Sequence, residues 1–391
     1  MPLLDISDKQ KQNVEAALFF ANKKQRPKRG SSESTLRIVH IIKHCNYANG
    51  NVHVAVDLAC EQAKEGYEVT FVSRGGTFEP LLAQHGVLHV YLPHEQSKPA
   101  SLLKAAWHLT KLVRKTRPNV LHAHMMASAL IGYVASRIAG MPLITTVHNS
   151  FDKHSVIMRL GDRVVAVSRA ERKQLLNKGY NSKRVVAVMN APNRSPRETF
   201  IKDKEEVTLQ SPCILAANGL HRRKGVSDLI VACRQLFEEI PDWRLYIAGE
   251  GPDRETLEQQ VHQAGIADRV HFLGFRSAPR PLMEQSDIFV LASYADPCSL
   301  AIGEARSAGC AIVATRVGGT PEMLEYGTAG RLVTPGNPDE LAQELRTLML
   351  DDEGRRKLRR AALQGSSIFD VQRLVEDYEQ VYRSAITCPR G

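Results

Sequence analysis

Short apolar runs of strand length alternate with segments of helical periodicity along most of the chain. The first run is LRIVHIIKH (36–44), and the strand-then-helix pattern repeats up to KRVVAVMNA (183–191). It starts again at CILAANGL (213–220), after a charged, irregular stretch at 192–212 that we interpret as an interdomain connection. Such alternation is typical of a parallel sheet covered on both faces. The pattern therefore predicts an α/β protein with two Rossmann-like, doubly wound parallel-sheet domains that face a cleft.

The same pattern divides the chain into four parts. These are a basic extension (1–34), a first Rossmann-like domain (35–195), a second one (210–368) and a C-terminal helical segment (369–391). The extension is rich in Lys, Arg, Gly and Ser, which predicts a flexible tail. The apolar Leu18, Phe19 and Phe20 leave a membrane-surface contact open as the alternative.

Charge, aromatic content, apolar runs and cysteine spacing limit the partners and the cellular location that we expect. The 391 residues carry a formal net charge of +10, which favours a polyanionic partner or an anionic membrane surface. The sequence has no nucleic-acid-binding motif and only 6% aromatic residues, so we expect no nucleic acid partner. No apolar run has the length of a transmembrane helix, and no secretory signal is visible. The seven cysteines include no CxxC pair, which argues against disulfides and structural zinc and favours a reducing, cytoplasmic location.

Two carboxylates in the second half, Asp296 and Glu304, flank the start of a predicted helix. Asp296 stands where an N-cap belongs, Pro297 where the first helical residue belongs, and the helix over 298–308 ends before Gly309. At a rise of about 1.5 Å per residue, the two backbones are about 12 Å apart. Two acids that share a proton must lie much closer, so this pair brackets a long ligand instead.

The helix N-terminus between the two acids favours phosphate, because its free N–H groups and positive dipole end attract anions. Small Cys298 and Ser299 leave room for a ligand to approach that backbone. A nucleotide sugar, with phosphate in the middle and hydroxyls at both ends, fits these features. The alternative is that Asp296 only caps the helix and that Glu304 is a surface residue.

Six stretches of the second half, one of which contains this pair, occur in a characteristic order. They are NGLHRRKGVSDLI, IAGEGPDRETLEQQV, VHFLGF, SDIFVLASYADPCSLAIGEARSAG, IVATRVGGTPEML and AGRLVTPGNPDELA. With the weaker NVLHAH, TTVHN and VVAVSRA of the first half, they closely resemble the retaining glycosyltransferases of the family 4 (group 1) type. The resemblance implies the GT-B fold and metal-independent, retaining transfer of a hexosyl unit from a nucleotide-diphosphate sugar, UDP- or GDP-linked, with no cofactor. It also implies that the helix in 369–391 crosses back to the first domain.

The resemblance assigns roles in the second half by position. Glu304 matches a glutamate that binds the ribose hydroxyls, and Lys224 matches the diphosphate-binding lysine. Asp296 matches a glutamate that contacts the donor sugar, although Asp is one methylene shorter. The backbone amides that would meet sugar and diphosphate are those of Cys298, Ser299 and Leu300. For HRRK (221–224) the alternative is a solvated basic turn.

Three further matches complete the expected donor site. The arginine that partners the family's lysine falls at Gly219, so His221, Arg222 or Arg223 would have to replace that cation. His148, after TTV, matches a histidine that faces the donor sugar, the alternative being a structural histidine. The base would be recognised by the backbone of VHFLGF, namely Phe272, Leu273 and Phe275. The turn against the diphosphate would be formed by Gly50, with hydrogen bonds from Asn49 and Asn51. We group His148, Lys224 and Asp296 as catalytic.

The acceptor is expected on the first domain, which carries a basic amphipathic segment at 97–118. Its cations are Lys98, Lys104, Lys111, Arg114, Lys115 and Arg117, and its apolar residues include Leu103, Trp107 and Leu112. Such a helix is compatible with peripheral binding to an anionic membrane, so we predict a lipid-linked or cell-envelope saccharide acceptor. An ordinary surface helix is the alternative.

Two other function classes remain open. A nucleotide-sugar epimerase shares the fold but requires extra acids and histidines around the sugar. A catalytically impaired nucleotide-sugar-binding module is the other alternative, given Asp296 and Gly219.

Overall fold

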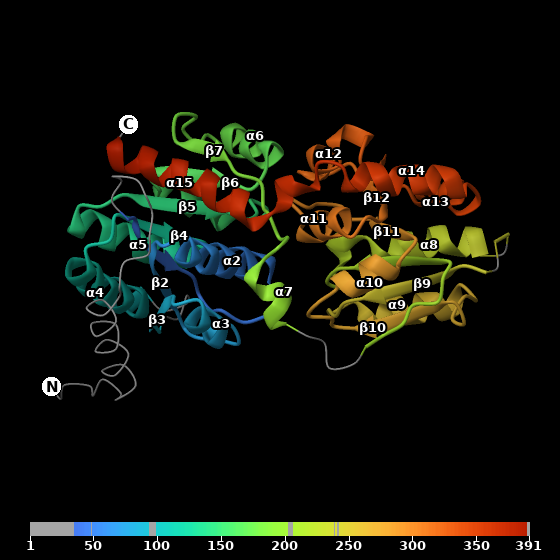
Figure 1. The fold of residues 1–391 in the computed structure, drawn as a ribbon, viewed down its shortest axis with the longest axis horizontal. Coiled ribbons are helices and arrows are strands. Elements are labelled where there is room, and N and C mark those ends of the chain that lie inside the picture. The colour runs from blue at the N-terminus through green and yellow to red at the C-terminus, as the bar shows by residue number, and fades with distance from the viewer. Residues whose placement is uncertain are drawn as a thin grey trace.

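The structure, a computed structural model, describes residues 35–47, 49–93, 99–201, 206–237, 239–240 and 242–388. The extension at 1–34 lies outside the described residues, and with it the apolar Leu18, Phe19 and Phe20; so does Lys98. Two α/β domains lie side by side (Figure 1), each built on a parallel sheet. The predicted fold class is therefore confirmed.

The first domain has a seven-stranded parallel sheet with strand order β3-β2-β1-β4-β5-β6-β7. Its strands are β1 (Arg37–Ile41), β2 (Glu68–Ser73), β3 (Leu88–Tyr91), β4 (Val120–Ala123), β5 (Leu143–Val147), β6 (Arg163–Ala166) and β7 (Val185–Ala187). Its helices are α2 (Gly50–Lys64), α3 (Glu79–Gln84), α4 (Pro99–Thr116), α5 (Met126–Ala139), η1 (Lys153–Leu160) and α6 (Arg169–Asn177). A short helix, α7 (Pro196–Phe200), lies in the connection to the second domain.

The second domain has a six-stranded parallel sheet with strand order β10-β9-β8-β11-β12-β13. Its strands are β8 (Cys213–Ala217), β9 (Arg244–Ala248), β10 (Val270–Gly274), β11 (Ile288–Leu291), β12 (Ala311–Thr315) and β13 (Arg331–Val333). Its helices are η2 (Arg222–Lys224), α8 (Val226–Phe237), α9 (Arg254–Gln263), α10 (Arg280–Gln285), α11 (Leu300–Ser307), α12 (Thr320–Met323), η3 (Glu325–Gly327), α13 (Pro338–Leu350) and α14 (Asp352–Leu363).

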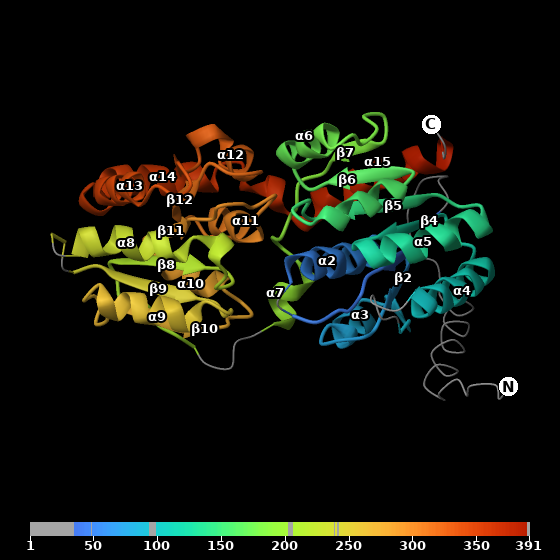
Figure 2. The same cartoon turned by 180° about the vertical axis from the view of Figure 1, so that it is seen from behind.

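Both sheets are covered on both faces (Figures 1 and 2). In β1 the side chain of Ile38 packs with α2 on one face, whereas Val39 and Ile41 pack with α4 and α5 on the other. Successive strand residues point to opposite faces, so a strand buried on both sides does not alternate between buried apolar and exposed polar residues. This explains why β5 (LITTV) and β11 (IFVL) are fully buried runs without hydrophobic–polar alternation.

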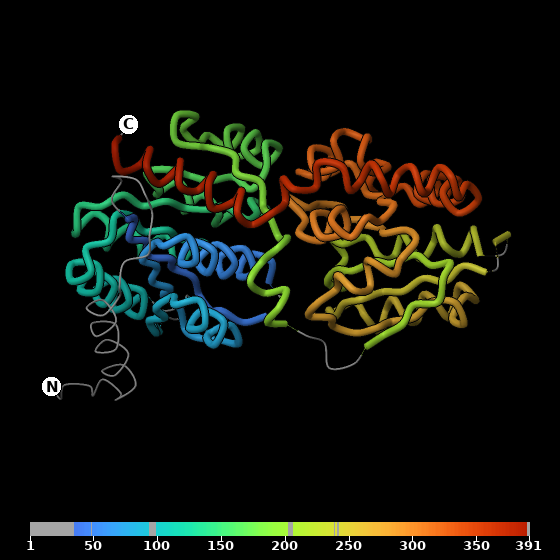
Figure 3. The backbone as a smooth tube through the Cα atoms, viewed as in Figure 1, coloured from blue at the N-terminus to red at the C-terminus, as the bar shows by residue number. Residues whose placement is uncertain are grey.

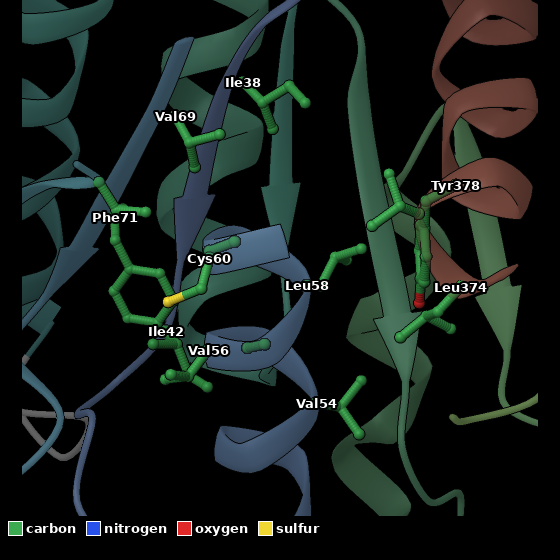
Figure 4. Packing of buried hydrophobic residues seen from close by; sticks show 14 of the residues in the cluster. Ile38, Ile42, Val54, Val56, Leu58, Cys60, Val69, Phe71, Leu374 and Tyr378 are labelled. Atoms are coloured by element: carbon green, nitrogen blue, oxygen red, sulfur yellow. The ribbon is translucent and has the colours of Figure 1, made fainter. Parts of the chain in front are cut away.

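The last helix belongs to the core of the first domain. After η4 (Ser366–Phe369), α15 (Val371–Thr387) packs against α2 and β5. Figure 3 shows the chain passing between the domains twice, once through the connection that contains α7 and once just before α15. Leu374 and Tyr378 of α15 join the same buried cluster as Val54 and Leu58 of α2 (Figure 4). Helix α15 therefore ties the end of the second domain to the first.

The order of the strands positions the site. In each sheet the strand order reverses beside the first strand, between β1 and β4 and between β8 and β11. Ligands of open parallel sheets bind outside the carboxyl ends of the strands at such a reversal. The loops after β1, β5, β8 and β11 therefore meet where the two domains face each other. None of the described helices combines the length and apolar character needed to cross a bilayer.

Candidate functional site

A cavity of about 560 Å³ lies between the two domains and is lined by residues from both. This volume is in the range of small-molecule sites. The predicted site residues in its wall are Asn49, Gly50, Asn51, His148, Gly219, His221, Arg223, Lys224, Phe275, Asp296, Cys298, Ser299, Leu300 and Glu304. Arg222 and Leu273 are not part of this wall. The structure therefore brings together residues that are up to 255 positions apart, from Asn49 to Glu304.

Two helix N-termini, one from each domain, meet at this cavity. Helix α2 begins at Gly50 and helix α11 at Leu300. A Cβ atom on Gly50 would lie 3.4 Å from Leu300 Cδ1, so the two ends are in van der Waals proximity. The free N–H groups and the positive dipole ends of both helices therefore lie at one place, which favours an anion between the domains.

Lys224 is positioned by a glycine that follows it. The turn η2 ends at Gly225, whose φ of +65° is a left-handed conformation, and a Cβ atom there would lie 1.9 Å from the Ala292 carbonyl oxygen. Only glycine allows this close approach of the turn to the loop after β11. Lys224 Nζ lies 2.7 Å from Asp296 Oδ2, and the two side chains are 16% and 7% exposed. The structure thus holds the ammonium group at the wall of the cavity.

The predicted role of Asp296 as a helix cap is wrong. Helix α11 begins at Leu300, not at Cys298, and its N-cap residue is Ser299. The loop before it is bonded to its neighbours instead: Gly319 N–H donates to the Asp296 and Pro297 carbonyl oxygens at 3.3 and 3.1 Å. These tertiary contacts hold Asp296 away from the helix, and its carboxylate accepts a hydrogen bond from Lys224.

The site of the missing arginine is occupied by a histidine. A Cβ atom on Gly219 would lie 3.1 Å from His221 Cδ2, so the imidazole covers the space into which a side chain at 219 would extend. Arg223 also lines the cavity; it donates to the Ala295 carbonyl oxygen at 2.6 Å, and its guanidinium lies 5.5 Å from the ring of Phe151 in the first domain. Arg222 is exposed and does not line the cavity.

Glu304 is accompanied by an arginine that the sequence did not reveal. Arg197 of α7 lines the cavity, and its guanidinium makes two hydrogen bonds to the buried Asp57 of α2, at 2.8 and 2.9 Å. Burial raises the pKa of Glu304, and the Arg197 charge lowers it. The stretch at 192–212, which we expected to be irregular, contains the helix α7; the Ser-Pro pair before Arg197 is the helix-start pattern that marks it. No local pattern, however, predicts the partner Asp57, which is 140 positions away.

Of the three residues expected to recognise the base, Phe275 lines the cavity, whereas Phe272 and Leu273 do not. Leu273 lies in β10, and its partly buried side chain packs against the core of the second domain. Arg276 and Ser277, which follow Phe275, also line the wall. The loop after β10, more than the strand itself, therefore faces the ligand.

His148 follows β5 and lies at the cavity wall in the first domain. Its Nε2 atom is 3.4 Å from Nδ1 of the buried His124. Burial lowers the pKa of His148 to about 4, so the ring is neutral at pH 7. Behind it, His40, His122 and His124 have ring nitrogens within 4.8 Å of one another, a group that could hold a metal ion.

These histidines make the stability of the fold dependent on pH. Burial lowers the pKa of His40 and His148 from 6.5 to about 4, so unfolding at pH 5 takes up protons that the folded protein does not bind. Their stabilisation is complete above pH 6.5 and is lost as the pH falls toward 4. Between pH 7 and pH 5 we expect the free energy of unfolding, measured in urea, to fall by about 2 kcal/mol for each of the two rings. His40→Gln should remove the contribution of His40 to the pH dependence of the free energy of unfolding. A wild-type free energy of unfolding that does not change between pH 7 and pH 5 would contradict the lowered pKa values.

Comparison with known proteins places the chain in a family. The model of the glycosyl transferases group 1 matches residues 197–365, and the model of glycosyltransferase family 4 matches residues 48–193. The N-acetyl-alpha-D-glucosaminyl L-malate synthase of Bacillus anthracis is 26% identical over 357 residues, which cover 85% of this chain and 93% of the relative. The D-inositol 3-phosphate glycosyltransferase of Corynebacterium glutamicum is 25% identical over 86% of this chain and 91% of its own.

Solved structures have the same fold. HepE of Anabaena, in complex with UDP and glucose, has a TM-score of 0.76 at 21% identity, covering 89% of this chain and 100% of that chain. A glycosyltransferase from Rickettsia africae has a TM-score of 0.77 at 20% identity, covering 90% and 99%. With both family models matched in chain order and both GT-B domains present, this protein belongs to the group 1 / family 4 glycosyltransferases.

Proposed function

We propose that this glycosyltransferase moves a hexosyl unit from a nucleotide-diphosphate sugar, UDP- or GDP-linked, to a saccharide acceptor with retention of configuration and without a metal ion. One observation carries the donor class: two helix N-termini and Lys224 lie around one cavity between the domains. This arrangement suits a diphosphate, which carries its charge between two hydroxyl-bearing ends. The complex of HepE with UDP and glucose supports the same donor class.

The proposed mechanism follows from the placement of charge. As the glycosyl bond breaks, negative charge grows on the diphosphate, and fixed positive groups that are already in place lower the barrier. Lys224 and the N–H groups of Ser299 and Leu300 supply this charge, so no step requires a metal ion. The two domains enclose the donor and limit its hydrolysis by water. The neutral His148 meets hydroxyl groups of the sugar.

Calorimetric binding of UDP, GDP, ADP and CMP in the presence of EDTA tests the donor class. We expect one nucleoside diphosphate to bind with micromolar affinity, and its base then names the donor. Release of that nucleotide from the matching sugar donor separates an active enzyme from an impaired binding module. Absence of binding by all four nucleotides would contradict the proposal.

We also propose that the acceptor is lipid-linked or part of the cell envelope and that α4 contacts an anionic membrane. On α4 the side chains of Leu103 and Trp107 are 67% and 55% exposed, and Lys111 Nζ lies 4.9 Å from the Trp107 ring. Leu112, which the sequence placed with them, is partly buried against the core. The exposed apolar pair amid cations is the pattern of a helix that lies on a membrane surface.

Charge reversal on α4 should abolish binding to anionic vesicles. For Lys104, Lys111 and Lys115 changed to Glu, we expect loss of co-sedimentation with phosphatidylglycerol-containing vesicles, since each cation contributes about 1 kcal/mol near such a surface. Trp107 gives a second readout, because Trp243, the other tryptophan, is buried and only Trp107 should shift its emission. The control reverses three cations of α14, namely Arg356, Lys357 and Arg360. Equal binding by both variants would argue against this surface.

A further inference from the structure

A continuous series of hydrogen bonds runs from His148 into the core of the first domain. His148 Nε2 is 3.4 Å from His124 Nδ1, and His124 Nε2 is 3.0 Å from His40 Nδ1. His40 Nε2 is in turn 2.8 Å from Gln62 Oε1, on α2. His40, His124 and Gln62 are almost completely buried, at 0%, 2% and 0% exposed. The series therefore links the wall of the cavity to a glutamine that no solvent reaches.

The series continues from Gln62 to the C-terminal helix. Gln62 Nε2 donates to the hydroxyl of Tyr382 at 3.3 Å, and that hydroxyl is 2.8 Å from His122 Nδ1. His122 Nε2 is 2.7 Å from Thr146 Oγ1, which is 2.8 Å from the Tyr378 hydroxyl. Both tyrosines lie on α15, and their rings are fully buried. Gln62 thus joins one branch that leads to the cavity and another that leads to α15.

The amide of Gln62 fixes the direction of every hydrogen bond toward the cavity. An amide oxygen only accepts, so His40 carries its proton on Nε2 and accepts at Nδ1. His124 must then donate from Nε2 and accept at Nδ1, and His148 must donate from Nε2. In a neutral ring the other nitrogen carries no proton, so His148 Nδ1 is an acceptor. Among the described residues, none hydrogen-bonds His148 Nδ1.

The distances favour this direction over its reverse. In the reverse arrangement the Tyr382 hydroxyl would donate to the Gln62 oxygen, and 3.3 Å is long for an O–H···O bond but acceptable for an amide N–H donor. The 2.8 Å contact from His40 suits an N–H···O bond. A metal ion at the three histidines would have to displace these bonds, since both ring nitrogens of His40, His122 and His124 already have partners.

We propose that Gln62 is a positioning residue: through His40 and His124 it holds His148 in the Nε2–H tautomer, so that Nδ1 accepts a hydrogen bond from a hydroxyl of the donor sugar. The tautomer is a property of the buried series alone. Its use in sugar binding rests on the proposed function. In the proposed function His148 meets the sugar and Glu304 the nucleoside, so a wrong tautomer should impair turnover and leave nucleotide binding intact.

Nitrogen-15 NMR of the histidine rings tests the tautomer in the wild-type protein. The His148 signals are assigned by their absence in His148→Gln, and we expect a protonated Nε2 and an unprotonated Nδ1 at pH 7. An Nδ1–H tautomer in the wild type would overturn the proposal whatever the variants do. Displacement of the ring signals by a stoichiometric metal ion would overturn it as well.

Gln62→Met tests the role of the amide, because methionine fills a similar volume and cannot direct His40. We expect mixed tautomer signals at His148, about a tenfold lower kcat/KM for the donor sugar, as for the loss of one hydrogen bond, and unchanged nucleotide affinity. Tyr378→Phe is the matched control, since it removes a buried hydroxyl at the far end of the series and should leave the His148 signals unchanged. Unchanged His148 signals in Gln62→Met would overturn the proposal. Altered signals with unchanged turnover would uphold the tautomer control and refute the sugar contact.

Discussion

Lys224→Gln is expected to lower kcat by about 10²–10³-fold while the affinity for nucleotide falls far less. The ammonium group is held by Asp296 at 2.7 Å beside the two helix N-termini. The proposed mechanism places the growing charge of the leaving diphosphate at this position. The interaction of the ammonium group with the transition state is therefore stronger than its interaction with the bound donor, which lowers the barrier. Initial rates of nucleotide release and calorimetry on the same variant separate the two effects.

Two controls make this prediction specific. Arg222→Gln removes a neighbouring cation that lies outside the cavity wall, and it should retain wild-type turnover. Asp296→Asn removes the negative charge that pairs with Lys224 and leaves the positive charge of Lys224 in place, so it tests whether the ion pair positions the ammonium group. A kcat of Lys224→Gln within threefold of the wild-type value, with an unchanged melting temperature, would refute the assigned role.

Glu304→Ala is expected to weaken binding of the nucleoside diphosphate by about 10–100-fold, because hydrogen bonds to a charged group contribute about 1.5–3 kcal/mol. The carboxylate lies in the cavity wall on α11, and the cation of Arg197 lies close enough to lower its pKa. Glu304→Gln keeps the volume and one acceptor oxygen, so we expect an intermediate affinity. Calorimetry with the nucleotide alone isolates this contact from the sugar.

The control for Glu304 is Glu198→Ala. Glu198 is an exposed acid on α7 that also influences Glu304 and pairs with Arg280, but it does not line the cavity. If removal of either acid weakened nucleotide binding equally, general electrostatics and not a direct contact would explain the loss of affinity.

Several features could be predicted from the sequence because they depend on local rules. The alternation of apolar runs and helical periods depends only on which side chains a strand or helix must bury, and it predicted two parallel-sheet domains. The turn at Lys224 could also be predicted, since Gly225 and the helix that follows belong to one short segment. The family motifs around Glu304 pointed to the cleft for the same reason: they are contiguous in the chain.

Other features depended on segments that are far apart in the chain. Asp296 satisfies the local rule for a helix cap, yet contacts with Gly319 and Lys224 placed it elsewhere, because several tertiary hydrogen bonds outweigh one cap. Arg197 became part of the site only through Asp57, in another helix. The sequence by itself determined the fold and the segments that form the cleft, since periodicity and motifs act over neighbouring residues. Only the tertiary structure decided which polar groups pair inside it, because a buried donor or acceptor must be satisfied by whatever group the packing brings within reach.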